Sequence, residues 1–464
     1  MTNMEIRPPP LRLLLYSKLP EKAKARFYAE FSRLLELCHK ATPSFSQVPA
    51  EGTSLPFHKL ALLFPALILA PRSREDERVA ANALVRRRLD QYRQGFIREL
   101  VQDLYSIKSW SPREKADRAR ESPPDPSRMA QMQADNGNTR GAVQSLTSQQ
   151  ERVLIEGAIE DKILTQLYVK ELPSPTNGRR RTRLSSRSTP SLPDDVLEDM
   201  SEDDFLRSVR KVGTGKGGGP FAAVTDCLRN MAVHSYASGD GARHHPYLRS
   251  VMQYVGLLAN NMVPDGVRES AVSVYFSALY KDYDKDKMAI RPLGIGTAYR
   301  RLAAAIMARV FSKSAAAFLL PLNFGVGVKG GVDIAFHFAN AQCEKWVFRS
   351  AEETVSADKG PSRCFISLDL VNMFNRMSRR ECRQILEMHI PSLLPLFDAT
   401  YGGTNTVWYQ TPDGPFTSFQ QEEGFAQGDP LAPLFASLVL QKVLQPNRHA
   451  PQLQFNQLSH VVTC

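Results

Sequence analysis

A single carboxylate at the end of an apolar strand is the sharpest chemical feature of the sequence. Residues 364–370 (CFISLDL) alternate as a β-strand does, with Ile366, Leu368 and Leu370 on one face and Asp369 on the other. A carboxylate in apolar surroundings is costly to leave unpaired, so we expect Asp369 to face a cation. The competing interpretation is a structural acid, which is the commoner use of a lone Asp.

A short basic strand is the second feature suited to binding charge. Residues 288–296 (MAIRPLGIG) form an apolar run that carries Arg291, and Lys287 comes just before it. A basic strand and loop that lead into a helix are suited to neutralising a triphosphate. Taken alone, this pattern equally fits an ordinary surface strand.

A glycine-containing loop precedes an apolar helix near residue 430. In residues 424–430 (GFAQGDP), Asp429 is a good N-cap and Pro430 fits the first helical position. Gln427 and Gly428 lie just before this helix, and Gly428 lets a base or sugar approach the backbone closely. The apolar face of the helix consists of Leu431, Leu434, Phe435, Leu438, Val439 and Val443.

Helices are the main elements that must position these residues. Apolar spacing predicts helices over residues 22–40, 57–70, 78–107 and 147–170. Two further helices have N-terminal capping signals, at Thr297 and in the Ser378–Glu381 capping box. The first is expected to bury Leu302, Ile306 and Val310, and the second Cys382, Ile385 and Leu386.

Strands accompany these helices, so the sequence indicates an α+β protein. Residues 405–410 and 416–420 flank Pro412-Asp-Gly414, a strong hairpin signal. Residues 171–200 are rich in Pro, Ser and Arg and poor in apolar residues, which predicts a disordered linker.

Composition limits the classes of protein. The 464 residues include 42% apolar residues and carry a formal net charge of +11, which suits a globular chain with a polyanionic partner. Six scattered cysteines without a CxxC pair indicate reduced thiols in an intracellular protein. We predict a nuclear or cytoplasmic protein, because the sequence shows neither a signal peptide nor a membrane span.

Four motifs in order resemble a reverse transcriptase of the non-LTR retrotransposon type. They are Arg291-Pro-Leu with Arg301, residues 324–331 (FGVGVKGG), residues 368–375 (LDLVNMFN) and residues 427–434 (QGDPLAPL). The resemblance covers about residues 200–455. It implies the fingers and partial palm of a right-hand polymerase, with an antiparallel sheet and packed helices. On this basis, residues 1–170 form a basic helical N-terminal region, and residues 201–464 form fingers and an incomplete palm without a thumb.

The resemblance also implies a metal-dependent catalytic centre. Asp369 matches the first metal-binding aspartate of the family, and Leu370 would offer its backbone carbonyl to a metal. Two Mg²⁺ ions serve nucleotidyl transfer in the intact family. The implied partners are an RNA template, a DNA primer and deoxynucleotides, with no small-molecule cofactor and no membrane.

Nucleotide-binding roles follow from the same resemblance. Phe374 matches the aromatic residue that excludes a ribose 2′ hydroxyl, and Gln427 and Gly428 match the pair that positions nucleotide and template. Lys287 and Arg291 resemble fingers residues that hold the triphosphate. Residues 324–331 resemble a segment that contacts the template.

One departure from the family pattern decides the expected activity. The family has an aromatic-x-Asp-Asp hairpin after the Gln-Gly pair, whereas no acidic residue follows Asp429 in this sequence. With Asp369 alone, the two-metal centre cannot be assembled as the family assembles it. We therefore expect the sequence to be truncated before the Asp-Asp motif, and we expect the chain as given to be catalytically inactive. The alternative interpretation is a non-catalytic nucleic-acid-binding remnant of a retroelement.

Overall fold

The structure is a computed structural model that describes most of the predicted helices and strands. The predicted helix over 147–170 lies outside the described residues except for three positions. The predicted strand over 364–370 also lies outside the described residues, except for Leu370. The same holds for the predicted linker over 171–200, except for Met200. The described residues are 6, 8, 20–42, 54–70, 79–107, 127, 130–131, 155, 160, 164, 200–211, 219–237, 243–280, 290–352, 370, 372–411 and 416–444.

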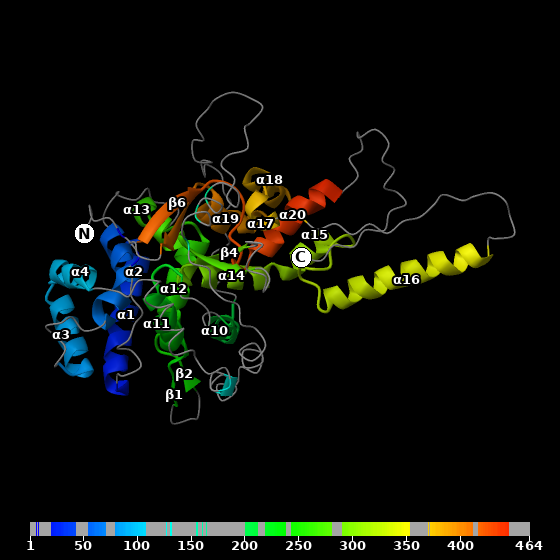
Figure 1. Ribbon diagram of the computed structural model, residues 1–464. Helices are drawn as coiled ribbons and strands as arrows, with labels where there is room; N and C mark the ends of the chain where they lie inside the picture. The colour runs from blue at the N-terminus through cyan, green and yellow to red at the C-terminus, as the bar shows by residue number, and fades with distance from the viewer. Residues whose placement is uncertain are drawn as a thin grey trace.

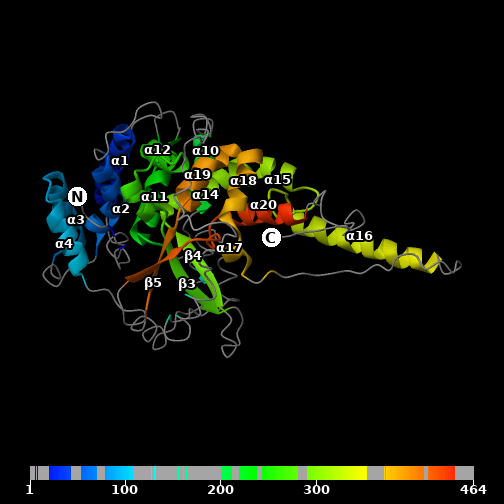
Figure 2. The ribbon, with the colours of Figure 1, turned by 90° about the horizontal axis from the view of Figure 1, so that it is seen from above.

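Four helices form the N-terminal layer, at one end of the body in Figures 1 and 2. They are α1 (Glu21–Ala41), α2 (Leu55–Leu69), α3 (Ala81–Arg93) and α4 (Ile97–Ser106). The first two confirm the helices predicted over 22–40 and 57–70. The single helix predicted over 78–107 is wrong, because Gly95 adopts a φ of 88° and divides it into α3 and α4.

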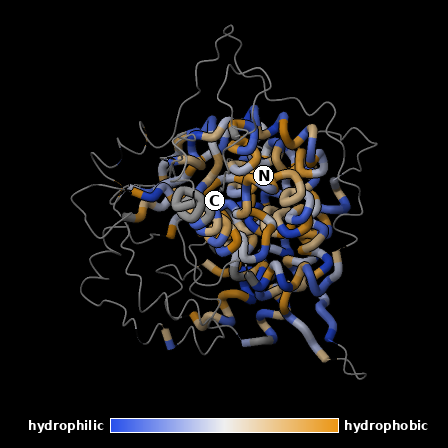
Figure 3. The backbone as a smooth tube through the Cα atoms, turned by 90° about the vertical axis from the view of Figure 1, so that its right-hand side faces the viewer, coloured by the Kyte–Doolittle hydropathy of each residue, from blue (hydrophilic) through white to orange (hydrophobic). Residues whose placement is uncertain are grey.

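Further described helices follow along the chain, and the first of them pack mainly against one another. Those before the sheet strands are α10 (Glu202–Lys211), α11 (Ala222–Val233), α12 (Leu248–Ala259) and α13 (Asp265–Val272). Helix α1 packs against both α2 and α12, and α12 packs against α14, so the N-terminal layer shares one hydrophobic core with the later helices. Figure 3 shows apolar and hydrophilic segments alternating within this body, as expected of amphipathic helices.

Later helices complete the body. They are α14 (Ala298–Val310), α15 (Ser312–Leu319), α16 (Gly331–Glu352), α17 (Met373–Arg376), α18 (Arg379–His389), the short 3₁₀ helix η5 (Pro391–Leu393), α19 (Leu394–Tyr401) and α20 (Ala432–Leu444). Helix α16 projects away from the other elements in both ribbon views (Figures 1 and 2).

Both predicted caps are confirmed. The Thr297 hydroxyl accepts a hydrogen bond from the backbone N–H of Arg300, and the Ser378 hydroxyl accepts one from that of Glu381. Leu302 and Ile306 are buried as predicted. Val310 is not, because it lies in the last turn of α14, where 37% of its surface is exposed.

The apolar face predicted for the helix after residue 430 is also largely confirmed. Its members from Leu431 to Val439 are buried, and the helix is α20. Val443 is the exception, with 75% of its surface exposed near the C-terminal end of this helix.

A four-stranded sheet lies against the helical body, with strand order β4-β3-β5-β6. Its strands are β3 (Val274–Tyr280), β4 (Ile290–Gly296), β5 (Asn405–Gln410) and β6 (Phe416–Gln421). The last two confirm the predicted hairpin. The predicted antiparallel sheet is wrong in one respect, since β3 and β5 pair in parallel while the other two pairs are antiparallel.

A second, two-stranded sheet is formed by β1 (Tyr236–Ala237) and β2 (Arg243–His244). The described part of the molecule is thus a mixture of helix and sheet, as α+β predicts. No single described helix combines the length and apolar composition needed to cross a bilayer, and only the bent pair α14 and α15 meets these criteria jointly.

A buried histidine of α2, His58, links α2 to α1 and α12. His58 Nε2 lies 3.0 Å from the Thr42 hydroxyl, which itself donates to the carbonyl of Cys38. The hydroxyl proton is thereby used, so Nε2 must donate to Thr42. The other ring nitrogen, Nδ1, faces the Tyr254 hydroxyl at 3.4 Å. Burial lowers the pKa of His58 from 6.5 to about 4, so the ring is neutral in the folded protein.

We predict an acid-dependent loss of stability at His58. Because its pKa is lower in the folded than in the unfolded chain, the contribution is complete above about pH 6.5 and is lost as pH falls toward 4. The loss is roughly 3 kcal/mol for a shift of this size. Urea unfolding at pH 7 and pH 4 should therefore show a smaller pH difference for His58→Gln than for the unsubstituted chain. His337→Gln, at an exposed position on α16, is the control and should retain the full pH difference.

Candidate nucleotide-binding site

A loop between β6 and α20 brings together segments that are distant in the sequence. The backbone N–H of Gly294 in β4 donates to the carbonyl of Gln427 at 2.8 Å. On the other side of the loop, the N–H of Phe425 donates to the carbonyl of Phe374 in α17 at 2.7 Å. The loop therefore lies between the basic strand and the turn that follows the predicted carboxylate strand.

Two glycines permit this close approach. Gly424 has a φ of 72°, and a Cβ at this position would lie 2.3 Å from the carbonyl carbon of Asn375. Gly428 has a φ of 127°, and a Cβ there would lie 2.8 Å from the carbonyl oxygen of Gly294. A side chain at either position would meet backbone atoms, so the loop geometry requires glycine at both.

A buried ion pair fixes the end of the loop. Asp429 Oδ2 accepts hydrogen bonds from Nε and Nη2 of Arg300, at 3.0 and 2.9 Å, and from the Tyr401 hydroxyl at 2.9 Å. The side chains of Arg300 and Asp429 are only 1% and 4% exposed. Burial disfavours the charged form of Arg300, but Tyr401 and Asp429 outweigh it and raise the pKa of Arg300. The guanidinium is therefore charged inside the core.

Asp429 lies three residues before the first residue of α20, so the helix begins two residues later than the predicted Pro430. Its second oxygen, Oδ1, accepts the backbone N–H of Leu431 at 2.9 Å, which caps the turn that leads into the helix. One carboxylate thus both caps this turn and neutralises Arg300. The sequence pattern indicated a capping role and missed the ion pair.

A second buried arginine supports the start of the same loop. Arg379 Nε donates to the carbonyl of Gly424 at 2.8 Å, and its backbone N–H donates to the carboxylate of Glu423 at 3.0 Å. The guanidinium groups of Arg300 and Arg379 lie 4.7 and 5.1 Å from the centre of the Tyr401 ring. Tyr401 therefore contacts both cations through its ring.

The structure unites four of the predicted site residues around this loop. Gln427 is half-buried and Gly428 is exposed beside Leu293, whose backbone pairs with Gln427 in a β-bridge. Arg291 precedes Leu293 by two residues, on the same face of β4, and is exposed. Phe374 is half-buried and packs against the main core.

Of the other three predicted site residues, the structure describes Leu370. Leu370 is 46% exposed, so its side chain is not part of the core. Asn372 follows it with a φ of 54°, which turns the chain toward α17. Asp369 and Lys287 lie outside the described residues.

Acidic and other metal-binding side chains do not gather at this loop in the described structure. No group of three His, Cys, Asp or Glu residues suitable for a metal ion occurs in this part of the chain. Asp429 and Glu423 are engaged with the buried arginines. Because Asp369 lies outside the described residues, the two-Mg²⁺ centre stays a prediction that depends on the resemblance alone.

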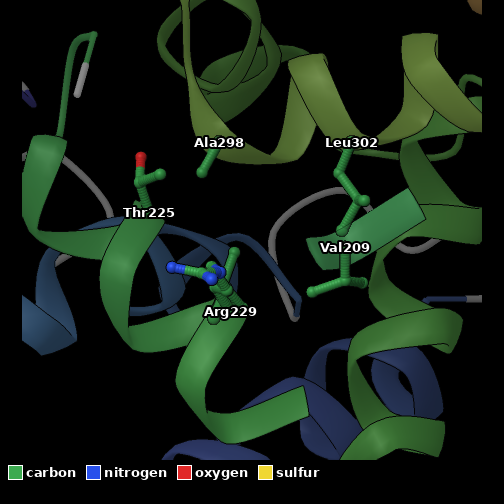
Figure 4. A pocket seen from close by; sticks show the side chains of 6 residues that line it. Val209, Thr225, Arg229, Ala298 and Leu302 are labelled. Carbon is green, nitrogen blue, oxygen red and sulfur yellow. The ribbon is translucent and has the colours of Figure 1, made fainter. Parts of the chain in front are cut away.

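A small pocket lies elsewhere, between α10, α11 and α14 (Figure 4). Thr225 in its wall accepts a hydrogen bond from Arg301 at 3.1 Å. The remaining lining is mostly apolar and includes no predicted site residue, so we assign no chemistry to it. The lining residues are Val209, Thr225, Leu228, Arg229, Ala298 and Leu302.

Comparisons with protein-family models and with curated proteins give no match for this chain.

We predict that removing the buried carboxylate destabilises the fold strongly. Asp429→Ala leaves Arg300 charged and unpaired in the core, which costs about 3–5 kcal/mol. Urea unfolding followed by circular dichroism measures the change. The double variant Arg300→Met, Asp429→Leu removes both charges and should regain most of the loss.

An exposed ion pair provides the matched control. Arg26 and Asp90 form an ion pair in which both side chains are substantially exposed. Asp90→Ala should leave the unfolding midpoint nearly unchanged, because solvent already screens such pairs. A similar loss for Asp90→Ala and Asp429→Ala would contradict the assigned role of the buried pair.

Proposed function

We propose that this chain is the nucleotide- and template-binding part of a reverse-transcriptase-type polymerase. The observation that carries the proposal is the convergence of three motif segments on one loop. The strand of Arg291, the turn of Phe374 and the Gln427–Gly428 pair are hydrogen-bonded into a single unit. The resemblance assigns all three to nucleotide binding, and chance motifs would have no reason to meet.

The chemistry of the exposed groups supports the same ligand. Arg291 offers a permanently charged guanidinium, which pairs well with phosphate oxygens. Gly428 is exposed and offers backbone without a side chain, which leaves room for a sugar or base. Gln427 offers an amide that can donate and accept hydrogen bonds.

Binding and catalysis are separable in this proposal. The 464 residues include Asp369 but no aromatic-x-Asp-Asp sequence after it. We therefore expect these residues to bind a primer–template without extending it. Extension of a DNA primer on an RNA template with Mg²⁺ present would contradict this part of the proposal.

We predict that nucleotide binding depends on Gln427 and Arg291. A complementary deoxynucleotide should tighten the complex of the chain with a primer–template, as measured by fluorescence anisotropy. Gln427→Ala and Arg291→Ala each remove a hydrogen-bonding or charged contact of about 1.5–3 kcal/mol, so the nucleotide effect should weaken by about one to two orders of magnitude.

Arg86→Ala is the matched control for Arg291→Ala, because Arg86 is an exposed arginine on α3, far from the loop. It should leave the nucleotide effect intact. An equal loss in the Arg86 and Arg291 variants would instead indicate general attraction of an anion to a basic protein. A primer–template that binds without any nucleotide effect would favour the non-catalytic binding remnant.

We further predict that Phe374 discriminates between sugars. If its ring excludes a 2′ hydroxyl, Phe374→Ala should bring the affinities for a deoxynucleotide and its ribonucleotide closer together. Competition in the same anisotropy assay measures both affinities. Phe374→Tyr retains the ring and should retain the preference, whereas an unchanged preference in Phe374→Ala would exclude this role.

A further inference from the structure

A continuous row of side chains crosses the four-stranded sheet on one face. The strand register pairs Ile295 of β4 with Tyr275 of β3, Tyr275 with Trp408 of β5, and Trp408 with Ser418 of β6. Directly paired residues of neighbouring strands point to the same side of a sheet. The two aromatic residues of the row therefore stand next to each other on one face.

The two faces of the sheet are packed very differently. The opposite face carries Val274, Phe276, Val407 and Tyr409, all buried, and Ile155 packs against them. On the row face, Ile295, Tyr275 and Trp408 each remain partly exposed and Ser418 is exposed. The larger hydrophobic cluster of the sheet thus lies on one side, and the aromatic residues of the row lie partly exposed on the other.

A third ring enlarges this outward face. Phe416 pairs with Gln410, two residues beyond Trp408, and therefore points to the same side. Its ring centre lies 5.9 Å from that of Tyr275, with the ring planes inclined at 56°. We call Tyr275, Trp408 and Phe416 the aromatic face.

The charge around the aromatic face favours a polyanion. Arg291 is exposed on the same side of β4, and the whole chain carries a net charge of +11. Among the described residues, the acid Glu269 contacts the far end of this face, where it bonds to Thr406 and Gln420. Among the residues of these four strands that the structure describes, none is acidic.

The aromatic face also continues into the loop described above. Leu293 lies on the same side of β4, and its side chain is 3.3 Å from the position that a Cβ of Gly428 would occupy. A nucleic-acid strand bound at Gly428 would therefore lie next to β4, on the side of the sheet that carries Tyr275.

We infer that the aromatic face binds single-stranded nucleic acid by stacking its bases on these rings, with Arg291 beside the phosphates. Partly exposed rings interleaved with neutral polar groups and an arginine are typical of surfaces that bind single strands. The inference depends on the proposed function for the class of ligand. It adds a surface that requires neither a nucleotide nor a primer.

Trp408 itself can report the contact. Replacing Trp110 and Trp346 with Phe leaves Trp408 as the sole tryptophan of the three. Stacking of a base on its ring should quench its fluorescence when oligodeoxythymidylate is added, and a duplex of equal length should quench far less. Binding without quenching would place the strand elsewhere and overturn the inference.

Affinity measurements with variants give the second test. Trp408→Ala and Tyr275→Ala should each weaken binding of oligodeoxythymidylate by roughly 5- to 150-fold, the range for losing one base–aromatic contact. Trp408→Phe retains a ring and should lose much less. Tyr236→Ala is the matched control, because Tyr236 is 57% exposed on a different sheet. Equal losses in Tyr236→Ala and Tyr275→Ala would overturn the inference.

The two proposals fail in different ways. If Trp408→Ala leaves single-strand affinity unchanged while Gln427→Ala abolishes the nucleotide effect, the aromatic face is excluded and the nucleotide site stands. If Trp408→Ala weakens single-strand binding but no nucleotide effect exists, the aromatic face stands without a polymerase function. Circular dichroism of each variant confirms that these outcomes come from folded protein.

Discussion

The buried pair of Arg300 and Asp429 is the constraint on which the candidate site depends. The arginine lies in the first turn of α14, directly after β4, and the aspartate lies three residues before the start of α20. Because neither charge reaches solvent, neither can be left without the other. The pair thereby holds the ends of two segments together, and the loop that carries Gln427 has little freedom to leave β4. Tyr401 adds α19 to the same arrangement through its hydroxyl and its ring.

Local sequence signals predicted several of the described helices and strands. The ion pair that they did not predict depends on contacts between residues far apart in the sequence. The caps at Thr297 and Ser378 and the hairpin around residues 412–414 depend on a few neighbouring residues, and all are confirmed. The pairing of Arg300 with Asp429 joins residues far apart in the sequence, so no local pattern announces it. The available signal was an arginine and an aspartate in or just before the first turns of two helices with predicted apolar faces, where an unpaired charge is costly.

The candidate site shows the same difference between local motifs, which the sequence reveals, and long-range pairing, which it does not. Motif order was enough to nominate Arg291, Phe374, Gln427 and Gly428, and these four do lie around one loop. The aromatic face was harder to foresee, because periodicity within one strand does not say which neighbouring strand it will pair with. Only the register of β3 with β5 sets Tyr275 beside Trp408.

The parallel pairing of β3 with β5 has a consequence for the order in which the chain folds. Strands β3 and β4 are near neighbours in sequence and can pair as soon as both are synthesised. Val274 pairs with Val407, which follows only after six further described α-helices, α14 to α19, and the 3₁₀ helix η5. Contacts between such distant residues form slowly. Until then one edge of β3 is without its partner strand, and such edges are where nascent chains associate with one another. The joining of β5 to β3 is therefore a late step in the assembly of this sheet.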